Sequence, residues 1–295
     1  MKFLKGLALT LLSFLLFLSL SVFGFALTLN YTILNPDFVV SELNRLDISS
    51  LAGELLSQQI PQQGEFMAGA IDDVIADLEP WIKEQASTVI YSGYDYLKGK
   101  SQNLSLVIPL EPVKENLKDS LRKAFLQSPP PEFQRLPPAE QERYFNELYQ
   151  NFARTIPSKF EFNESSLSPE VKAGLEQAKQ YIGYLQLGYK ALIGFMLFLI
   201  LCIILIHRQV KGATRSLGST FLTYGVLEYA GIFAAKYFAG TQLGQLQIPS
   251  SLQAWLPQFL SDFLAPLEMF SLGLLIAGVV LIIVSFVYKP REPSF

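Results

Sequence analysis

Apolar residues along this chain gather in long uninterrupted blocks instead of alternating regularly with polar ones. A helix needs about 20 consecutive apolar residues to cross a hydrocarbon core about 30 Å thick. Four blocks approach that length, and we therefore predict a mainly α protein with four transmembrane helices. The blocks cover residues 6–29, 191–207, 217–238 and 266–288.

Basic residues flank these blocks unevenly. They precede the first block, fill the short connection between the second and third, and follow the fourth: Lys2, Lys5, Arg208, Lys211, Arg215, Lys289 and Arg291. Cytoplasmic loops carry an excess of Lys and Arg. We predict a multi-pass protein of the plasma (cytoplasmic) membrane, with both termini in the cytoplasm and residues 30–186 outside the cell.

The first block has two interpretations. Its start, "MKFLKGLALTLLSFLLFLSLSVFGFA", also resembles a secretory signal with a cleavage site at Gly24-x-Ala26. Its apolar region of about 20 residues exceeds the 7–15 of a typical signal. This favours an uncleaved anchor over residues 1–29, whereas cleavage would leave three spans and an outside N-terminus.

The segment between the first two blocks, residues 30–186, is long enough for one extracytoplasmic domain. It carries 22 acidic and 14 basic side chains, a net charge of −8. An acidic surface of this kind argues against a nucleic-acid partner and against direct adhesion to anionic lipid.

Hydrophobic periodicity within this domain predicts mostly helices. Apolar residues recur at helical spacing over residues 64–98, 112–127 and 139–156, and an Asn-Pro pair at 35–36 marks a further helix start. Pro80 is expected to kink or split the first of these stretches. Alternation over 103–110 and 159–163 predicts two short strands that could pair. The proline-rich stretch 128–138 is the predicted hinge.

A long helix is expected to connect the domain to the membrane. "SPEVKAGLEQAKQYIGYLQLGYK" begins with a Ser cap and Pro, and no breaker separates it from the second span. We predict one helix over 169–208, with a membrane-proximal stem at 169–190. Tyr181, Tyr184 and Tyr189 suit an interfacial aromatic belt, and Lys190 can extend to the outer headgroups.

Residues 187–295 are predicted to form a C-terminal membrane region that holds the remaining three spans. Between the last two, apolar residues repeat at helical spacing near 250–264. One interpretation is an amphipathic helix in the outer membrane interface, anchored by Trp255. The other is a helix packed under the outer domain. Pro257 is expected to kink or break it.

Glu228 lies near the centre of the third predicted span. A carboxylate at that depth costs about 3 kcal/mol and often marks function. Its helical neighbours include Tyr224, Gly225, Gly231 and Ala235, a face that suits close helix packing. Glu228 is therefore either a proton or cation relay or ligand contact, or a protonated side chain that hydrogen-bonds across helices, with Tyr224 as a donor. The small residues favour the second interpretation.

Lys236 lies two helical turns beyond Glu228, about 12 Å along the axis. That distance is too long for direct pairing with Glu228. We expect Lys236 to extend toward the outer interface, as Lys190 does.

Few residues suited to catalysis or metal binding are present. The chain has one cysteine, Cys202, and one histidine, His207, and it lacks phosphate-loop, dinucleotide and zinc motifs. Asp73 and Asp77 lie one helical turn apart, but a solvated helix face is the simpler interpretation. We therefore expect no enzyme activity, no metal and no cofactor.

The layout resembles a group of four-pass bacterial integral membrane proteins with a helical extracytoplasmic domain and no characterised activity. The resemblance covers much of the chain and rests on stretches such as "LSPEVKAGLEQAKQYIGYLQLGYKALIG". It implies no activity and no functional residue. We predict a non-enzymatic cell-envelope protein whose outer domain binds a protein, a lipid or an envelope component. The alternative is a small transporter or accessory subunit that uses Glu228.

Overall fold

The computed structural model of the chain describes residues 2–59, 65–127, 135–163, 167–242 and 248–288. These residues form nine helices and two strands, so the predicted mainly α class is confirmed. They fall into two compact units. The first comprises Met1–Phe38, Gln180–Leu246 and Leu256–Phe295, and the second comprises Val39–Lys179 and Gln247–Trp255.

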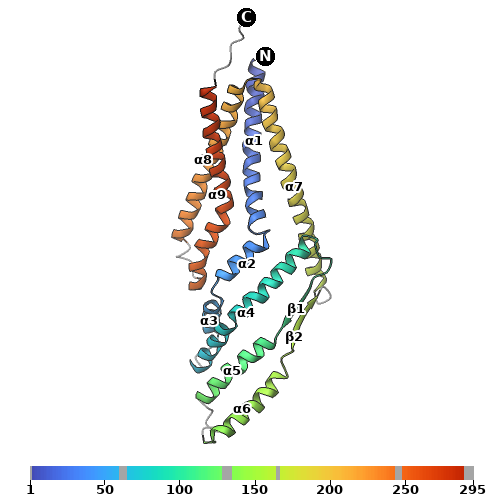
Figure 1. Cartoon of the computed structure of the whole chain (residues 1–295), viewed down its shortest axis with the longest axis vertical. Coiled ribbons are helices and arrows are strands. Elements are labelled where there is room, and N and C mark those ends of the chain that lie inside the picture. Colours follow the sequence, from blue (N-terminus) through green and yellow to red (C-terminus); the bar gives the residue numbers. More distant parts are fainter. Residues whose placement is uncertain (1, 60–64, 128–134, 164–166, 243–247, 289–295) are drawn as a thin grey trace. The chain divides into compact units, whose positions relative to one another are not determined.

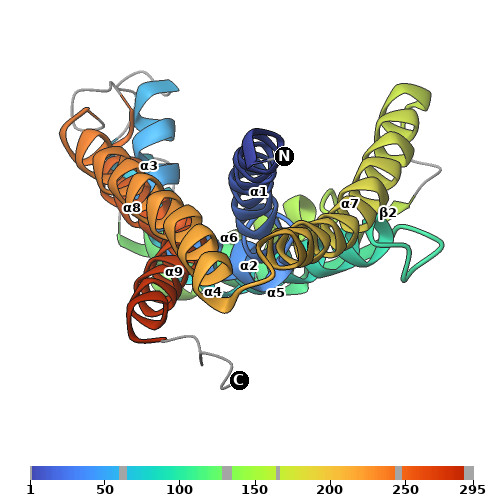
Figure 2. The ribbon, with the colours of Figure 1, turned by 90° about the horizontal axis from the view of Figure 1, so that it is seen from above.

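The first unit consists of long helices around an apolar core (Figure 1). Helix α1 covers Lys2–Tyr31, α7 covers Pro169–His207, α8 covers Val210–Gln242 and α9 covers Ser250–Val287. Buried side chains of α1, α7 and α8 meet in one cluster, made of Leu16, Leu20, Phe23, Met196, Leu199, Ile203, Leu217 and Tyr224. Helices α8 and α9 lie side by side in both views (Figures 1 and 2).

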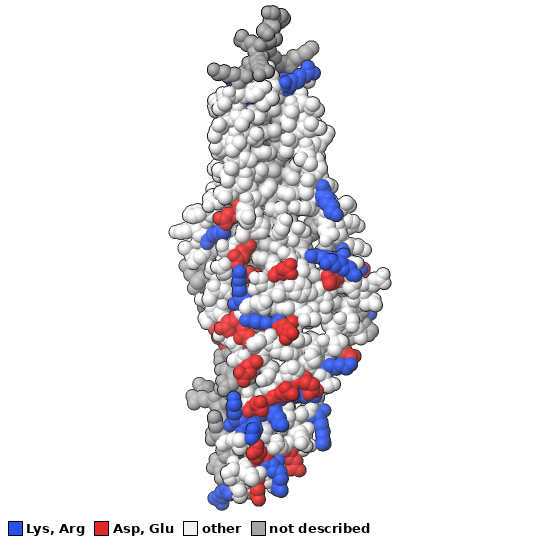
Figure 3. Space-filling model, viewed as in Figure 1, with Lys and Arg blue, Asp and Glu red and all other residues white. Residues whose placement is uncertain are grey.

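Three helices are long and apolar enough to cross a membrane: Phe3–Tyr31, Pro169–His207 and Ser250–Val287. Their outward surfaces are apolar as well, because large side chains such as Phe14, Phe198 and Phe286 remain exposed. The upper half of Figure 3 carries few charged side chains. An apolar surface this large is stable in lipid and costly in water. These helices therefore have the composition of a multi-pass membrane protein.

Helix α8 is not among the three candidate spans, although it is 33 residues long. It begins at Val210, so Lys211 and Arg215 belong to its first turns and the helix starts before the predicted span, whose bounds stay a prediction. The connection from α7 consists only of Arg208 and Gln209. Arg208 has a φ of 57°, the left-handed conformation that commonly ends a helix.

The second unit contains shorter elements. Helix α2 covers Pro36–Arg45, α3 covers Ile48–Gln59, α4 covers Glu65–Leu97, α5 covers Glu111–Gln127 and α6 covers Pro138–Ala153. Strand β1 covers Ser105–Pro109 and β2 covers Lys159–Asn163. Helix α4 packs against α3, α5 and β1, and α5 packs against α6. Buried apolar side chains at these contacts are Val40, Leu78, Tyr96, Leu104, Leu106 and Phe145.

The predicted strand pairing is confirmed. β1 and β2 form a two-stranded antiparallel sheet. Leu106 lies opposite Phe162, and Ile108 lies opposite Phe160. Paired residues project from the same face of a sheet, so the alternating apolar residues of both segments share one face.

Prolines do not divide the helices as the sequence led us to expect. Helix α4 continues through Pro80, and α9 continues through both Pro257 and Pro266. The helix predicted near 250–264 is present as the first part of α9, and it continues without a break into the predicted fourth span. By contrast, the single long helix predicted over 169–208 is confirmed as α7.

Some predictions lie outside the described residues. Most of the predicted hinge, residues 128–134, belongs to this group, as do Lys289 and Arg291. The structure describes the backbone of α4 at Asp72 and Asp73 but not their side chains, so the carboxylate pair of Asp73 and Asp77 stays a prediction.

Candidate functional site

Glycines bring the backbones of α8 and α9 together. A Cβ added at Gly225 would lie 2.8 Å from the Ser271 carbonyl oxygen, and one added at Gly278 would lie 2.6 Å from the Leu222 amide nitrogen. A Cβ at Gly218 would lie 3.0 Å from the Gly278 carbonyl oxygen. Side chains at these positions would force the helices apart. Small-residue contacts of this kind associate helices in lipid, where the hydrophobic effect does not act between them.

Tyr224 occupies the centre of the first unit and is only 1% exposed. Its ring packs edge-on against Phe17 of α1 and Phe270 of α9, with centroid distances of 5.7 and 5.9 Å. Its hydroxyl lies against Gly24 of α1, where an added Cβ would come within 2.6 Å of the oxygen. Tyr224 therefore joins three helices through one side chain.

The Tyr224 hydroxyl has no hydrogen-bond partner among the described residues, so the expected bond to Glu228 is not formed. Glu228 itself is partly exposed. On the same face, Gly231 has open space around it and Ala235 is exposed. This face of α8 therefore packs against other helices at Tyr224 and Gly225. Gly231 and Ala235, which follow Glu228 on the same face, do not share that close packing. A relay or ligand role for Glu228 stays a prediction.

The Lys236 side chain forms an ion pair with Glu268 instead of extending unpaired toward the outer interface. Its amino group lies 2.5 Å from a carboxylate oxygen of Glu268 on α9, and both side chains are about one-third exposed, at 29% and 34%. The sequence reasoning overlooked Glu268, which lies in the first turn of the fourth predicted span. Lys236 lies near the end of the third predicted span, and Glu268 lies near the start of the fourth. These two ends are adjacent when consecutive helices run antiparallel, so the sequence could have indicated that the opposite charges pair.

Trp255 and Lys190 were predicted to lie at the membrane interface. The indole N–H of Trp255 donates to the Glu42 carbonyl oxygen at 3.2 Å, within the second unit. That contact favours the interpretation in which this part of the chain packs against the outer domain. Lys190 is exposed on α7, next to Tyr189, whose ring stacks on Phe23 at 5.1 Å.

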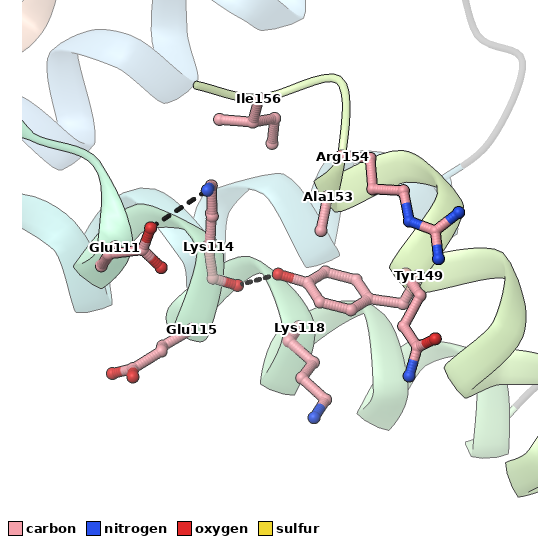
Figure 4. Close-up of a pocket in the computed structure, with 9 residues that line it drawn as sticks. Glu111, Lys114, Glu115, Lys118, Tyr149, Ala153, Arg154 and Ile156 are labelled. Carbon is pink, nitrogen blue, oxygen red and sulfur yellow. Dashed lines mark hydrogen bonds and ion pairs between the residues drawn. The ribbon is translucent and has the colours of Figure 1, made fainter. Parts of the chain in front are cut away.

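A shallow groove of about 620 Å³ lies between α5 and α6 (Figure 4). The Tyr149 ring reaches from α6 toward α5, and its hydroxyl donates to the Lys114 carbonyl oxygen at 2.5 Å. The Lys114 amino group pairs with Glu111 at 3.1 Å, and the Lys118 amino group lies 5.9 Å from the Tyr149 ring centre. Arg154 follows the end of α6 and adds a third cation.

The groove is suited to polar contact and not to nucleophilic chemistry. Burial raises the pKa of Tyr149, and the nearby carboxylate of Glu111 adds to that effect. The hydroxyl therefore stays protonated at neutral pH and acts as a donor. Across the part of the chain that the structure describes, no three His, Cys, Asp or Glu side chains gather to hold a metal.

Sequence reasoning did not identify this groove. The available signal was a run of charged residues at helical spacing in α5, Glu111, Lys114, Glu115 and Lys118.

Three large side chains form an apolar stripe along α6. Tyr144, Leu148 and Phe152 follow one another at intervals of four residues and are 38%, 54% and 47% exposed. Phe145, on the adjacent face, is buried against Phe125 of α5 with ring centroids 5.7 Å apart. The helix predicted over 139–156 is confirmed as α6, but only part of its apolar face is covered in the described structure.

Comparison with protein-family models, with curated proteins and with solved structures finds no match to this chain.

Proposed function

We propose that the protein is a non-enzymatic, multi-pass membrane protein that presents its second unit outside the cell to bind another protein. Residues 1–29 anchor the chain, α8 forms the fourth span, and both termini lie in the cytoplasm. The distribution of Lys and Arg around the apolar blocks supports this orientation.

The observation that carries the proposal is the apolar stripe of Tyr144, Leu148 and Phe152. Rows of exposed aromatic and aliphatic side chains at the spacing of a helical turn are typical of protein contact sites. A lipid ligand held by this unit in water would require a deep apolar cavity for its acyl chains. The groove described in this unit is instead shallow and lined by charged side chains, which favours a protein partner over a lipid.

Single-cysteine labelling tests the orientation. In a Cys202→Ser background, which removes the only native cysteine, we expect a membrane-impermeant maleimide to label Ser101→Cys and Thr241→Cys in intact cells. It should label Gln209→Cys only after permeabilisation. Gln209 and Thr241 are exposed, and Ser101 is partly exposed. Labelling of positions 209 and 241 from the same side would show that α8 does not span the membrane.

Site-specific photocrosslinking in native membranes tests the docking surface. A photoreactive residue at Leu148 should give one discrete protein adduct, which mass spectrometry then identifies. The same residue at Gln150, exposed on the other side of α6, should give none. The adduct should also disappear when Phe152→Asp is added, because a charge in the stripe opposes apolar contact. An adduct of equal yield at both positions would overturn the proposal.

The alternative is a small transporter or accessory subunit that uses Glu228. It is favoured by the Tyr224 hydroxyl, which lies one turn from Glu228 and is buried without a partner in the described structure. Liposomes that contain the full chain would then show proton or cation flux, and Glu228→Gln would abolish it. Absence of flux above protein-free liposomes would exclude this alternative.

A further inference from the structure

A second pocket, of about 440 Å³, lies within the first unit where α1, α8 and the end of α7 meet. Its walls are rich in hydroxyl groups, contributed by Thr10, Ser13, Ser216, Ser219 and Thr220. Arg215 and His207 also line it, and no carboxylate does among the described residues. The pocket therefore offers hydrogen-bond donors and positive charge but no negative charge.

The hydroxyls of Thr10 and Thr220 donate to the carbonyl oxygens of Gly6 and Ser216, so the serine hydroxyls and Arg215 are the donors left for a ligand. The hydroxyl oxygens of Ser13 and Ser216 lie 3.2 Å apart, and one hydroxyl donates to the other. The accepting hydroxyl can then donate its own hydrogen to a ligand. Nε2 of His207 is buried and has no partner among the described residues. The exposed Arg215 guanidinium presents five N–H donors in a planar fork. This combination suits a tetrahedral oxyanion, since Arg binds phosphate oxygens in pairs.

A close backbone approach fixes the imidazole of His207. A Cβ added at Gly212 would lie 2.5 Å from Nδ1 of His207, so the ring packs directly on the glycine. Arg215 lies on α8, three residues after Gly212. The imidazole of His207 and the guanidinium of Arg215 are thus held by the end of α7 and the first turns of α8.

We propose that this pocket binds the phosphate group of an anionic phospholipid in the cytoplasmic leaflet. The leaflet assignment rests on the proposed orientation, in which Arg208, Lys211 and Lys5 mark the cytoplasmic side. Basic pockets between transmembrane helices at this depth bind anionic headgroups. The hydroxyls hold the phosphate oxygens, and the exposed apolar surfaces of α1 and α7 accommodate the acyl chains.

Lipid binding to the purified full chain in detergent micelles tests the proposal, with tail-labelled phosphatidylglycerol as the probe. We expect Arg215→Gln to weaken binding by about tenfold at both 0.15 M and 1 M salt, as for the loss of one charge-assisted contact. Lys211→Gln is the matched control, because Lys211 carries the same charge nearby but does not line the pocket. Lys211→Gln should weaken phosphatidylglycerol binding at most about fivefold at 0.15 M salt. It should have no effect at 1 M salt, where the screening length is about 3 Å.

A second variant pair tests the geometry. Gly212→Ala should displace His207 and weaken phosphatidylglycerol binding, whereas Gly194→Ala, which faces open space on α7, should not. Size-exclusion chromatography of each variant verifies folding. Equal effects of Arg215→Gln and Lys211→Gln at 1 M salt, or equal binding of phosphatidylcholine, would overturn the proposal.

Inorganic phosphate distinguishes the two sources of the phosphate group. Competition at millimolar phosphate together with lipid binding supports the lipid headgroup site. Binding of inorganic phosphate without any binding of phosphatidylglycerol would overturn the lipid assignment. The assay uses protein in micelles and does not depend on orientation, so its failure can be told apart from failure of the labelling experiment.

Discussion

Replacing Gly278 with alanine is expected to separate α8 from α9. A Cβ added there would lie 2.6 Å from the Leu222 nitrogen and 2.9 Å from the Gly218 carbonyl oxygen. Both contacts are to backbone atoms, so no side-chain rotation can relieve them. Ordinary van der Waals contact begins near 3.4 Å, and the difference from 2.6 Å requires the helices to move apart by about 0.8 Å.

The energetic cost follows from that displacement. A gap of about 0.5–1 Å forfeits a quarter to a half of the dispersion energy between the atoms that line it. Overpacking of a close contact costs about 1–3 kcal/mol, while the better helix propensity of alanine returns about 1 kcal/mol. We therefore expect Gly278→Ala to weaken the association of α8 with α9 by up to about 2 kcal/mol, which is up to roughly thirtyfold in the equilibrium constant.

The assay needs a reporter at the same helix pair, because both tryptophans of the chain, Trp81 and Trp255, belong to the second unit. In a Cys202→Ser background, Lys236→Cys and Glu268→Cys place two thiols where α8 and α9 already meet. Crosslinking of the two thiols by a short bifunctional maleimide is followed during titration with sodium dodecyl sulfate in mixed micelles. Gly278→Ala should lose crosslinking at a lower detergent fraction than the parent.

Gly273→Ala is the matched control on the same helix, because a Cβ at Gly273 meets no atom within 4 Å. It should leave the crosslinking midpoint unchanged or raise it slightly through helix propensity. If Gly278→Ala and Gly273→Ala behave alike, the close backbone contact does not hold the two helices together, and the reasoning from the glycines fails.

Three further predictions concern single side chains. Tyr224→Phe should raise stability by about 1 kcal/mol, because it removes a buried hydroxyl without a partner among the described residues; a lower thermal midpoint in detergent would indicate an undetected partner. Lys236→Met should destabilise the chain more than the double variant Lys236→Met with Glu268→Leu, since the single change leaves a partly buried charge unpaired; equal thermal midpoints would contradict this. Hydrogen bonds from the side chain and backbone of Ser50 lower the pKa of Asp47, which precedes α3. A lowered pKa stabilises the folded state above the unfolded value of 3.8 and loses that effect as pH falls through the folded value. Asp47→Ala should thus cost about 1 kcal/mol at pH 7 and progressively less as the pH falls below 3.8, which tryptophan fluorescence can follow; a cost that does not vary with pH would refute the assignment.

The elements that the sequence predicted well are those set by local pattern. The apolar residues at alternate positions, Leu106 and Ile108, identified β1, and the matching Phe160 and Phe162 identified its partner. The absence of a breaker after Pro169 identified α7 as one helix. These elements depend on residues close together in the sequence, so the periodicity of the apolar residues was sufficient to predict them.

Other features depend on contacts between segments far apart in the sequence. Continuity of α9 through Pro257 and Pro266 was not predicted, because the local penalty of a proline takes no account of surrounding packing. The pair of Lys236 and Glu268 and the α5–α6 groove were not found for the same reason. Each joins side chains whose proximity is decided by helix packing. The position of Glu228 beside the buried Tyr224 was foreseen, but the missing bond between them was not.

The glycine contact between α8 and α9 has a consequence for how the chain enters the membrane during synthesis. Helix α8 is not apolar enough to be a candidate span by itself, whereas α9 is the most apolar of the long helices in the first unit. Helix α8 therefore needs a partner, and Gly218 and Gly225 fit closely against α9. We expect α8 to remain near the translocon until α9 has been made, and the two to move into lipid together as a hairpin. In a ribosome-bound chain that ends before residue 250, a single cysteine on α8 should then react with a water-soluble maleimide, whereas in the full chain it should be protected.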